Sequence, residues 1–249
     1  MKKRFFSFTL CLSAFFITTF YSSCTKENNQ PLSKAASAQS NAEATGNSKL
    51  VLQPGPEDGQ DVYTVKLAGD GGANANTNFN ATHELAAIIW TINGAEVAER
   101  SFIKFTGLSA IPAGSKIVGA QLYLHGISSS VNHPQGNSVY PGSPYLPQYP
   151  DNSCSVERVV TDWDQTTVTW NTQPRVDTSG AATIYSSKNQ WNESAVVDVT
   201  DMVQRMVNSG KNYGFRIRQA EEVIYRSQQF AVSEDTNPDN RPRLVVLYN

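Results

Sequence analysis

The sequence predicts an all-β domain, a sandwich or barrel, that carries one short helix. Runs of β-branched and aromatic residues recur along the chain, and Gly, Pro and Asn separate them. Several runs alternate with period two: Leu122 and Leu124 fall on one face of their strand, while Tyr123 and His125 fall on the other. Short alternating runs between turn residues are typical of an antiparallel sandwich with one buried face.

The N-terminus has the features of an exported protein. Three basic residues at positions 2–4 precede an apolar run from Phe5 to Phe20, which is too short for a comfortable membrane span. We therefore expect residues 1–23 to be a signal peptide. Removing these basic residues takes the formal net charge from -2 to -5, and this weak acidity argues against nucleic acid as a partner.

The residues around Cys24 predict a lipid anchor. Tyr21, Ser22 and Ser23 precede this cysteine and resemble a bacterial lipobox, although Tyr21 stands where leucine is usual. We expect Cys24 to be lipidated, so that the chain is held at the bacterial outer membrane or cell surface and meets the membrane only through the lipid. An ordinary signal peptide with an incidental Cys24 is the alternative.

A spacer is expected to follow the anchor. Residues 24–49 are rich in Ser, Ala, Asn and Gln and hold almost no large apolar residues, a composition typical of a disordered linker. The remaining residues, 50–249, have the length of one sandwich domain. With Cys11 in the signal peptide and Cys24 acylated, Cys154 stands alone and is expected to be a small buried hydrophobe.

The expected elements follow one another closely along residues 50–249. Met202, Val203, Met206 and Val207 form i, i+4 apolar pairs, so residues 200–208 are expected to form the helix, which Gly210 ends. The expected strands cover residues 49–53, 61–67, 85–92, 100–107, 116–127, 154–160, 167–170, 182–187, 195–200, 213–219, 223–232 and 243–248.

Five segments in this order resemble the DNRLRE (disaggregatase-related) domain family. They are LVLQPGPEDGQDVYT (50–64), RSFIKFTGLSAIPAGSKIVGAQLYLHG (100–126), VERVVTDWDQTTVTWNTQP (156–174), VVDVTDMVQRMVNSGKNYGFRIR (196–218) and RPRLVVLY (241–248). The resemblance implies a jelly-roll-like β-sandwich of secreted and surface proteins. It also implies carbohydrate binding, since some relatives are carbohydrate-binding modules that favour uronate polymers.

Two tryptophans in the segment DWDQTTVTWNTQP have either a structural or a binding role. Trp170 shares a strand face with Val168 and is expected in the core, where an indole contributes roughly 2–3 kcal/mol. Trp163 is expected to close one end of the sandwich from a turn. The alternative is that both indoles form an open platform on which sugar rings stack.

With the tryptophans in the interior, ligand contacts are expected on the longest loop, residues 128–153. Tyr140, Tyr145 and Tyr149 lie there among five prolines, and stiff aromatic side chains stack on sugar rings at little entropic cost. The alternative is a surface flap whose tyrosines pack onto the sandwich beneath.

A row of outward side chains is a second candidate site for an acidic glycan, because the planar fork of arginine matches a carboxylate. The row exists only if its strands are neighbours in one sheet. The alternative is a solvated face whose charges pair with Glu157 or Glu221. The proposed members of the row are Lys104, Tyr123, His125, Arg216 and Arg218.

A structural Ca²⁺ is the only cofactor that the sequence leaves open. Glu57, Asp58, Asp61 and Asp70 offer oxygen ligands of the kind that Ca²⁺ accepts, yet their spacing matches no known calcium loop. The three histidines at positions 83, 125 and 133 are scattered and lack the spacing of a zinc site.

Nothing in the sequence marks a catalytic centre. No Walker loop, G-x-S-x-G or HExxH motif is present. The sequence thus favours a non-catalytic, surface-anchored lipoprotein that binds polysaccharide, with uronate polymers as the expected class and the oligomeric state left open. One alternative is a polysaccharide lyase or hydrolase, with Tyr123, His125 and Arg216 as lyase candidates. Another is an adhesive protein that binds a second protein.

Overall fold

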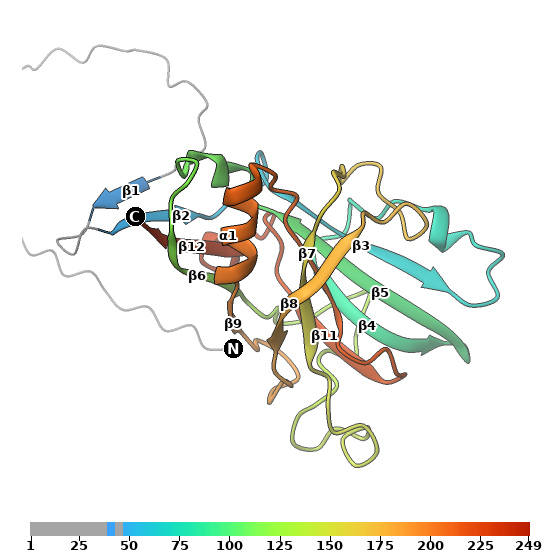
Figure 1. The fold of residues 1–249 in the computed structure, drawn as a ribbon. Coiled ribbons are helices and arrows are strands. Elements are labelled where there is room, and N and C mark those ends of the chain that lie inside the picture. The colour runs from blue at the N-terminus through green and yellow to red at the C-terminus, as the bar shows by residue number, and fades with distance from the viewer. Residues whose placement is uncertain (1–38, 43–46) are drawn as a thin grey trace, which may run out of the picture. The chain divides into compact units, whose positions relative to one another are not determined.

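The computed structural model describes residues 39–42 and 47–249, and it confirms an all-β sandwich with one short helix (Figure 1). Two antiparallel sheets carry all of the described strands. The predicted signal peptide, Cys24 and most of the predicted spacer fall outside the described residues. Among the described residues, the helix is too short and too polar to cross a membrane.

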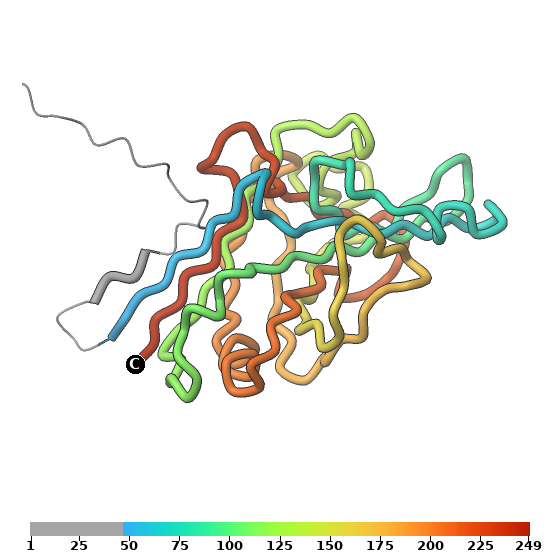
Figure 2. The backbone as a smooth tube through the Cα atoms, turned by 90° about the horizontal axis from the view of Figure 1, so that it is seen from above, coloured from blue at the N-terminus to red at the C-terminus, as the bar shows by residue number. Residues whose placement is uncertain are grey.

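The smaller sheet joins the two ends of the domain. Its order is β1 (Gln39–Ala42), β2 (Ser48–Leu52), β12 (Arg243–Tyr248), β6 (Ile117–Leu124) and β9 (Ala195–Asp198), and all neighbours are antiparallel. Figure 2 shows β2 in blue beside β12 in red. Because β12 lies between β2 and β6, the last strand of the chain lies inside the sheet and not at its edge.

The larger sheet is built on β5 (Ala95–Lys104), whose residues 97–104 pair with β3 (Gln60–Leu67). Its other edge is shared: residues 95–99 pair with β4 and residues 101–103 pair with β10. The sheet therefore divides into two branches. One branch holds β4 (Leu85–Ile92) and β11 (Arg226–Phe230), and the other holds β10 (Phe215–Gln219), β7 (Cys154–Val159) and β8 (Val176–Ile184).

The hydrophobic core lies between the two sheets. Leu122 and Leu244 from the smaller sheet meet Phe215 and Phe230 from the larger one, and all four are at most 1 % exposed. Burial of each such side chain contributes about 1.5–3 kcal/mol. Cys154 lies in the same core and is fully buried, as expected, and burial raises the pKa of its thiol.

The helix α1 (Thr200–Ser209) packs on this core through Met202, Val203 and Met206. The Asp198 carboxylate accepts the Thr200 backbone N–H at 2.9 Å and satisfies one free donor of the first turn. Gly210 ends the helix in the left-handed region, at φ 63°, which confirms the predicted stop. Three short 3₁₀ turns complete the described elements: Asn74–Asn76, Thr106–Ala110 and Pro238–Asn240.

Every predicted strand is present except residues 167–170, which form turns. Asp164 sets these turns: its carboxylate accepts the Thr166 N–H, and its carbonyl accepts the N–H groups of Thr167 and Val168. The β1 strand lies within the segment expected to be a disordered spacer. Pairing along the edge of β2 needs only backbone hydrogen bonds, which composition does not predict.

The two tryptophans have different environments. Trp163 is 8 % exposed, packs against Phe102, and donates its indole N–H to the Tyr213 carbonyl at 2.8 Å, so its predicted structural role is confirmed. The prediction that Trp170 is a core residue is wrong. With no strand to turn it inward, Trp170 stays half-buried beneath the Arg100 guanidinium, whose carbon lies 4.4 Å from the ring centroid.

Replacing Trp163 by alanine is expected to lower the free energy of unfolding by about 3–5 kcal/mol, because it removes a buried indole and leaves a carbonyl without its donor. Urea unfolding measures the change. Trp170→Ala is the matched control, with an expected loss below about 2 kcal/mol. Equal losses in the two variants would contradict the assigned roles.

Candidate functional site

The long connection between β6 and β7, residues 125–153, is docked on the larger sheet by buried polar contacts. The Ser138 backbone N–H donates to the Ser227 carbonyl at 3.0 Å, and the Asn137 side-chain oxygen accepts the Gln229 N–H at 3.0 Å. The Asn152 side chain donates to the same Ser227 carbonyl at 2.7 Å. The loop thus pairs the outer edge of β11, so its backbone is held in place.

An aromatic cluster forms where this loop meets the sheet. Tyr145 lies with its ring centroid 4.6 Å from that of Trp90 on β4, and it stacks on Tyr225 at 5.0 Å. Tyr225 also contacts Trp90 at 5.2 Å and Tyr149 at 5.4 Å. All four side chains are half-buried, so each is fixed by its neighbours and still reaches solvent. We call these four residues the aromatic cluster.

Tyr225 adopts a backbone conformation that bulky residues rarely take. Its φ is 64°, in the left-handed region, at the end of the connection between β10 and β11. A conformation of this kind costs on the order of 1–3 kcal/mol and persists where surrounding contacts fix it. Here the contacts are the rings of Trp90, Tyr145 and Tyr149, which hold Tyr225 at the surface.

The alternative that the loop tyrosines pack onto the sandwich holds for Tyr145 and Tyr149, which also present ring surface to solvent. Their contact with a ligand stays a prediction. Tyr140 is half-buried and makes no ring contact with the aromatic cluster among the described residues. The sequence analysis missed Trp90 and Tyr225. In the sequence they are only aromatic residues within two expected strands. Nothing there indicates which loop covers them.

The base of the loop is pinned by a buried histidine between two carboxylates. His133 Nδ1 lies 2.8 Å from Glu84 on one side, and Nε2 lies 2.8 Å from Glu99 of β5 on the other. All three side chains are at least nine-tenths buried. Burial alone would lower the pKa of His133, but the hydrogen bonds and charges of Glu84 and Glu99 outweigh it and raise the pKa to about 9.

The predicted cationic row is divided between the two sheets. Tyr123 lies on β6 of the smaller sheet, and His125 begins the connection that follows this strand, whereas Lys104 and the arginines lie on β5 and β10 of the larger sheet. The expectation of one shared face is wrong for Tyr123 and His125. Arg243 stacks on the Tyr123 ring, with its guanidinium carbon 4.5 Å from the centroid.

On the larger sheet, the arginines of the row are paired. Glu157, 1 % exposed on β7, accepts from Arg216 at 2.8 Å and from Arg218 at 3.0 Å. The alternative that the charges of this face pair with Glu157 is therefore right for these two residues. Two cations share one carboxylate, so this part of the face keeps a net positive charge. Glu221 pairs with Arg226 instead, at 3.0 Å.

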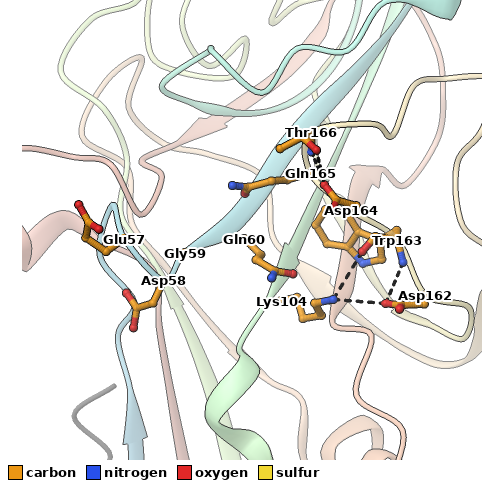
Figure 3. Close-up of a pocket in the computed structure, with 10 residues that line it drawn as sticks. All are labelled: Glu57, Asp58, Gly59, Gln60, Lys104, Asp162, Trp163, Asp164, Gln165 and Thr166. Atoms are coloured by element: carbon orange, nitrogen blue, oxygen red, sulfur yellow. Dashed lines mark hydrogen bonds and ion pairs between the residues drawn. The ribbon is translucent and has the colours of Figure 1, made fainter. Parts of the chain in front are cut away.

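Lys104 points into a separate hollow of about 610 Å³ (Figure 3). Its ammonium lies 3.4 Å from an Asp162 oxygen and 5.6 Å from the Trp163 ring centroid. Figure 3 shows Glu57 and Asp58 on the opposite side of the hollow. Carboxylates outnumber the single ammonium among the lining side chains, so this hollow disfavours an acidic ligand.

The four calcium candidates do not gather. Asp70 accepts the N–H groups of Gly72 and Asn74 in the turn after β3, so its carboxylate is used to shape that turn. Asp61, at the start of β3, is buried, and burial together with the charge of Glu234 raises its pKa to about 7. Asp58 and Glu57 line the hollow of Figure 3.

Within residues 47–249, no three acidic, histidine or cysteine side chains are grouped as a metal site would require. Glu57, Asp58, Asp61 and Asp70 thus do not form one donor set for Ca²⁺. A structural Ca²⁺ stays a prediction. The lyase candidates are also separated: Tyr123 lies on the smaller sheet and His125 just after its strand β6, while Arg216 is bound to Glu157 in the larger sheet.

The raised pKa of His133 predicts how stability depends on pH. The folded-state pKa of about 9 lies above the ordinary value of 6.5, so the stabilisation is complete below about pH 6.5 and is lost as pH rises through 9. Unfolding measured from pH 7 to pH 10 should show a loss on the order of 2–3 kcal/mol, and His133→Gln should lose much less over this range. The same loss in the variant would contradict the assignment.

Comparison with known proteins gives one family. The model of Carbohydrate-binding module family 96 matches residues 148–248, and no curated protein matches the chain. The matched segment supplies β7 to β12, including Tyr149 and Tyr225 of the aromatic cluster. Its strands pair with β2, β5 and β6, which precede it. Residues 148–248 thus match a family of carbohydrate-binding modules, and the fold that contains them extends back at least to β2.

Proposed function

We propose that this protein binds polysaccharide without cleaving it, and that the aromatic cluster is the surface on which sugar rings stack. The observation that carries the proposal is the arrangement of Trp90, Tyr145, Tyr149 and Tyr225. Four aromatic rings from three separate segments are fixed against one another and are each open to solvent on part of their surface. The family match to residues 148–248 supports carbohydrate as the ligand.

Fixed aromatic rings suit this ligand for a physical reason. A sugar ring has an apolar face of C–H groups, which gains dispersion and hydrophobic contact on a flat aromatic surface. Because neighbouring rings and the docked loop hold the cluster, binding orders few side chains and loses little conformational entropy. Contacts of this kind remain individually weak, so we expect affinities from micromolar to millimolar for a single domain.

Acidic polysaccharides, with uronate polymers as the leading class, are the proposed ligands. The support is the net positive face of the larger sheet, where Arg100, Arg216 and Arg218 outnumber Glu157 and Glu222. Arginine binds carboxylates with a planar fork. The resemblance to the DNRLRE family, in which some modules favour uronate polymers, supports the same class.

The proposed location is the bacterial outer membrane or cell surface, through a lipid at Cys24. The support is the basic and apolar N-terminus followed by Ser22, Ser23 and Cys24. Many copies on one surface would bind a long polymer at several points, and this avidity offsets weak single contacts.

A test of the proposal uses affinity gels that contain acidic or neutral polysaccharides, together with assays for new reducing ends and unsaturated ends. Retardation without product is the expected result. Product release would show a lyase or hydrolase instead, and neither retardation nor product would favour the adhesive alternative.

Replacing Tyr145 or Trp90 by alanine should weaken binding of the retarding polysaccharide at least tenfold, because each change removes a ring and loosens its neighbours. Tyr185→Ala is the matched control, since Tyr185 is 83 % exposed and makes no ring contact among the described residues. Unfolding curves check that each variant stays folded. An unchanged affinity in both cluster variants would overturn the proposed surface.

A further inference from the structure

The structure assigns a carboxylate-binding site to Arg100, and we propose that Glu222 occupies this site as an internal stand-in for the carboxylate of an acidic sugar. The inference deepens the proposed function and rests on it. It names Arg100 as the residue that binds the carboxylate of a uronate. It also implies that Glu222 competes with the ligand for Arg100.

The Arg100 guanidinium is held on two sides by one segment of the chain. Its carbon lies 4.4 Å from the Trp170 ring centroid, so the guanidinium packs over the indole. Gln173 accepts from Arg100 Nη1 at 3.4 Å and donates through its own amide to the Trp170 carbonyl at 3.0 Å. These contacts orient the fork of Arg100 before any ligand arrives.

The remaining edge of the fork is taken by Glu222. Arg100 Nε donates to Glu222 Oε1 at 2.7 Å, and Nη2 donates to Oε2 at 2.8 Å, which is the two-point geometry of an arginine with a bound carboxylate. Neither side chain is deeply buried, since Arg100 is 21 % exposed and Glu222 is 31 % exposed. A carboxylate from solution can therefore reach the position that Glu222 holds.

The segment that carries Glu222 is less constrained than the groups beneath it. Residues 220–223 are all exposed and belong to no strand or helix. The Ala220 N–H donates to the Ser153 carbonyl, and the Val223 N–H donates only to the Glu221 carbonyl two residues earlier. Arg218 donates to the Ala220 carbonyl at 3.1 Å, and Glu221 pairs with Arg226 at 3.0 Å. Among the described residues the Glu222 side chain itself hydrogen-bonds only Arg100, so it can leave Arg100 without breaking these neighbouring contacts.

The surrounding charges favour a carboxylate at this position. Burial would raise the pKa of Glu222, but the hydrogen bonds of Arg100 and the charges of Arg218 and Arg216 lower it. Glu157, held by Arg216 and Arg218, cannot leave because it is 1 % exposed. Glu157 is thus committed to Arg216 and Arg218, so the carboxylate that pairs with Arg100 comes from Glu222 or from a ligand.

The same connection also carries Tyr225 of the aromatic cluster. Glu222 and Tyr225 are three residues apart, so a ligand that displaces Glu222 acts on the segment that positions one of the stacking rings. Residues 222–225 thus connect the carboxylate site of Arg100 with the aromatic cluster along the chain.

The experiment compares Glu222→Gln with Glu221→Gln by titration with a uronic-acid oligosaccharide and with its carboxyl-reduced, neutral counterpart. The two variants lose the same charge at adjacent exposed positions, but Glu221 pairs with Arg226 instead of Arg100. Glu222→Gln should bind the acidic oligosaccharide about three- to tenfold more tightly and the neutral one as the wild type does. Glu221→Gln should change neither affinity.

Arg100→Lys supplies the second variant, because lysine keeps the charge and loses the planar fork. It should weaken binding of the acidic oligosaccharide about tenfold and leave the neutral one unchanged. An unchanged or lower affinity of Glu222→Gln for the acidic oligosaccharide would overturn the inference, as would equal gains for both ligands. If wild-type protein binds neither oligosaccharide nor any polysaccharide, the proposed function fails and this inference fails with it.

Discussion

The outer edge of β11 is a row of backbone donors and acceptors that need hydrogen-bond partners. The long loop supplies these partners, and its docking there positions the aromatic cluster. Residues 125–153 pair that edge through Asn137, Ser138 and Asn152. Pairing fixes a long loop that would otherwise be free, at a place where Tyr145 and Tyr149 reach Trp90. Without this docking the chain would keep its core and lose the aromatic cluster.

The docking has its own internal support. Gly136 lies at φ 64° against the Gln190 backbone, where an added Cβ would come within 2.7 Å of the carbonyl, so a larger residue would push the loop away. His133 links the loop to Glu84 and Glu99 beneath it. Buried polar contacts of this kind contribute little net stability each, yet they specify one arrangement because every unmatched partner is costly.

The division of the larger sheet at β5 separates the two parts of the proposed ligand surface. The branch of β4 and β11 bears Trp90 and accepts the long loop, while the branch of β10 and β7 bears Arg216, Arg218 and Glu157. The connection from β10 to β11 joins the branches; its Glu222 pairs with Arg100 of β5, and its Tyr225 packs on Trp90 of β4. A polymer that contacts both branches would be recognised by its shape, through the rings of the aromatic cluster, and by its charge, through the arginines.

Local patterns in the sequence predicted what depends on neighbours along the chain. Period-two alternation located nearly all strands, and the apolar pairs of residues 200–208 located the helix. Trp163 was assigned correctly because a turn carries it into the core. Trp170 was misassigned because Asp164 turns the segment that was expected to be a strand. Sequence cannot weigh a side-chain hydrogen bond of this kind against strand propensity.

The candidate sites depended on pairings between distant segments, and these were mostly out of reach. Alternation showed that Tyr123 and Arg216 face outward, but not that their strands belong to different sheets. The tyrosines of the long loop could be singled out from the sequence as candidate ligand contacts, and that role stays a prediction. Their partners are distant in the sequence: Trp90 lies 55 residues before Tyr145, and Tyr225 lies 76 residues after Tyr149. Only the fold brings them together.

The central claim is that sugar stacks on the aromatic cluster and not on the indole of Trp163. The chain has four tryptophans, and their indole N–H signals can be followed by nuclear magnetic resonance during titration with an acidic oligosaccharide. The account predicts that the Trp90 signal shifts while that of Trp163, bound to the Tyr213 carbonyl, stays in place. A shift of Trp163 with Trp90 unmoved would contradict it and place the ligand in the acidic hollow.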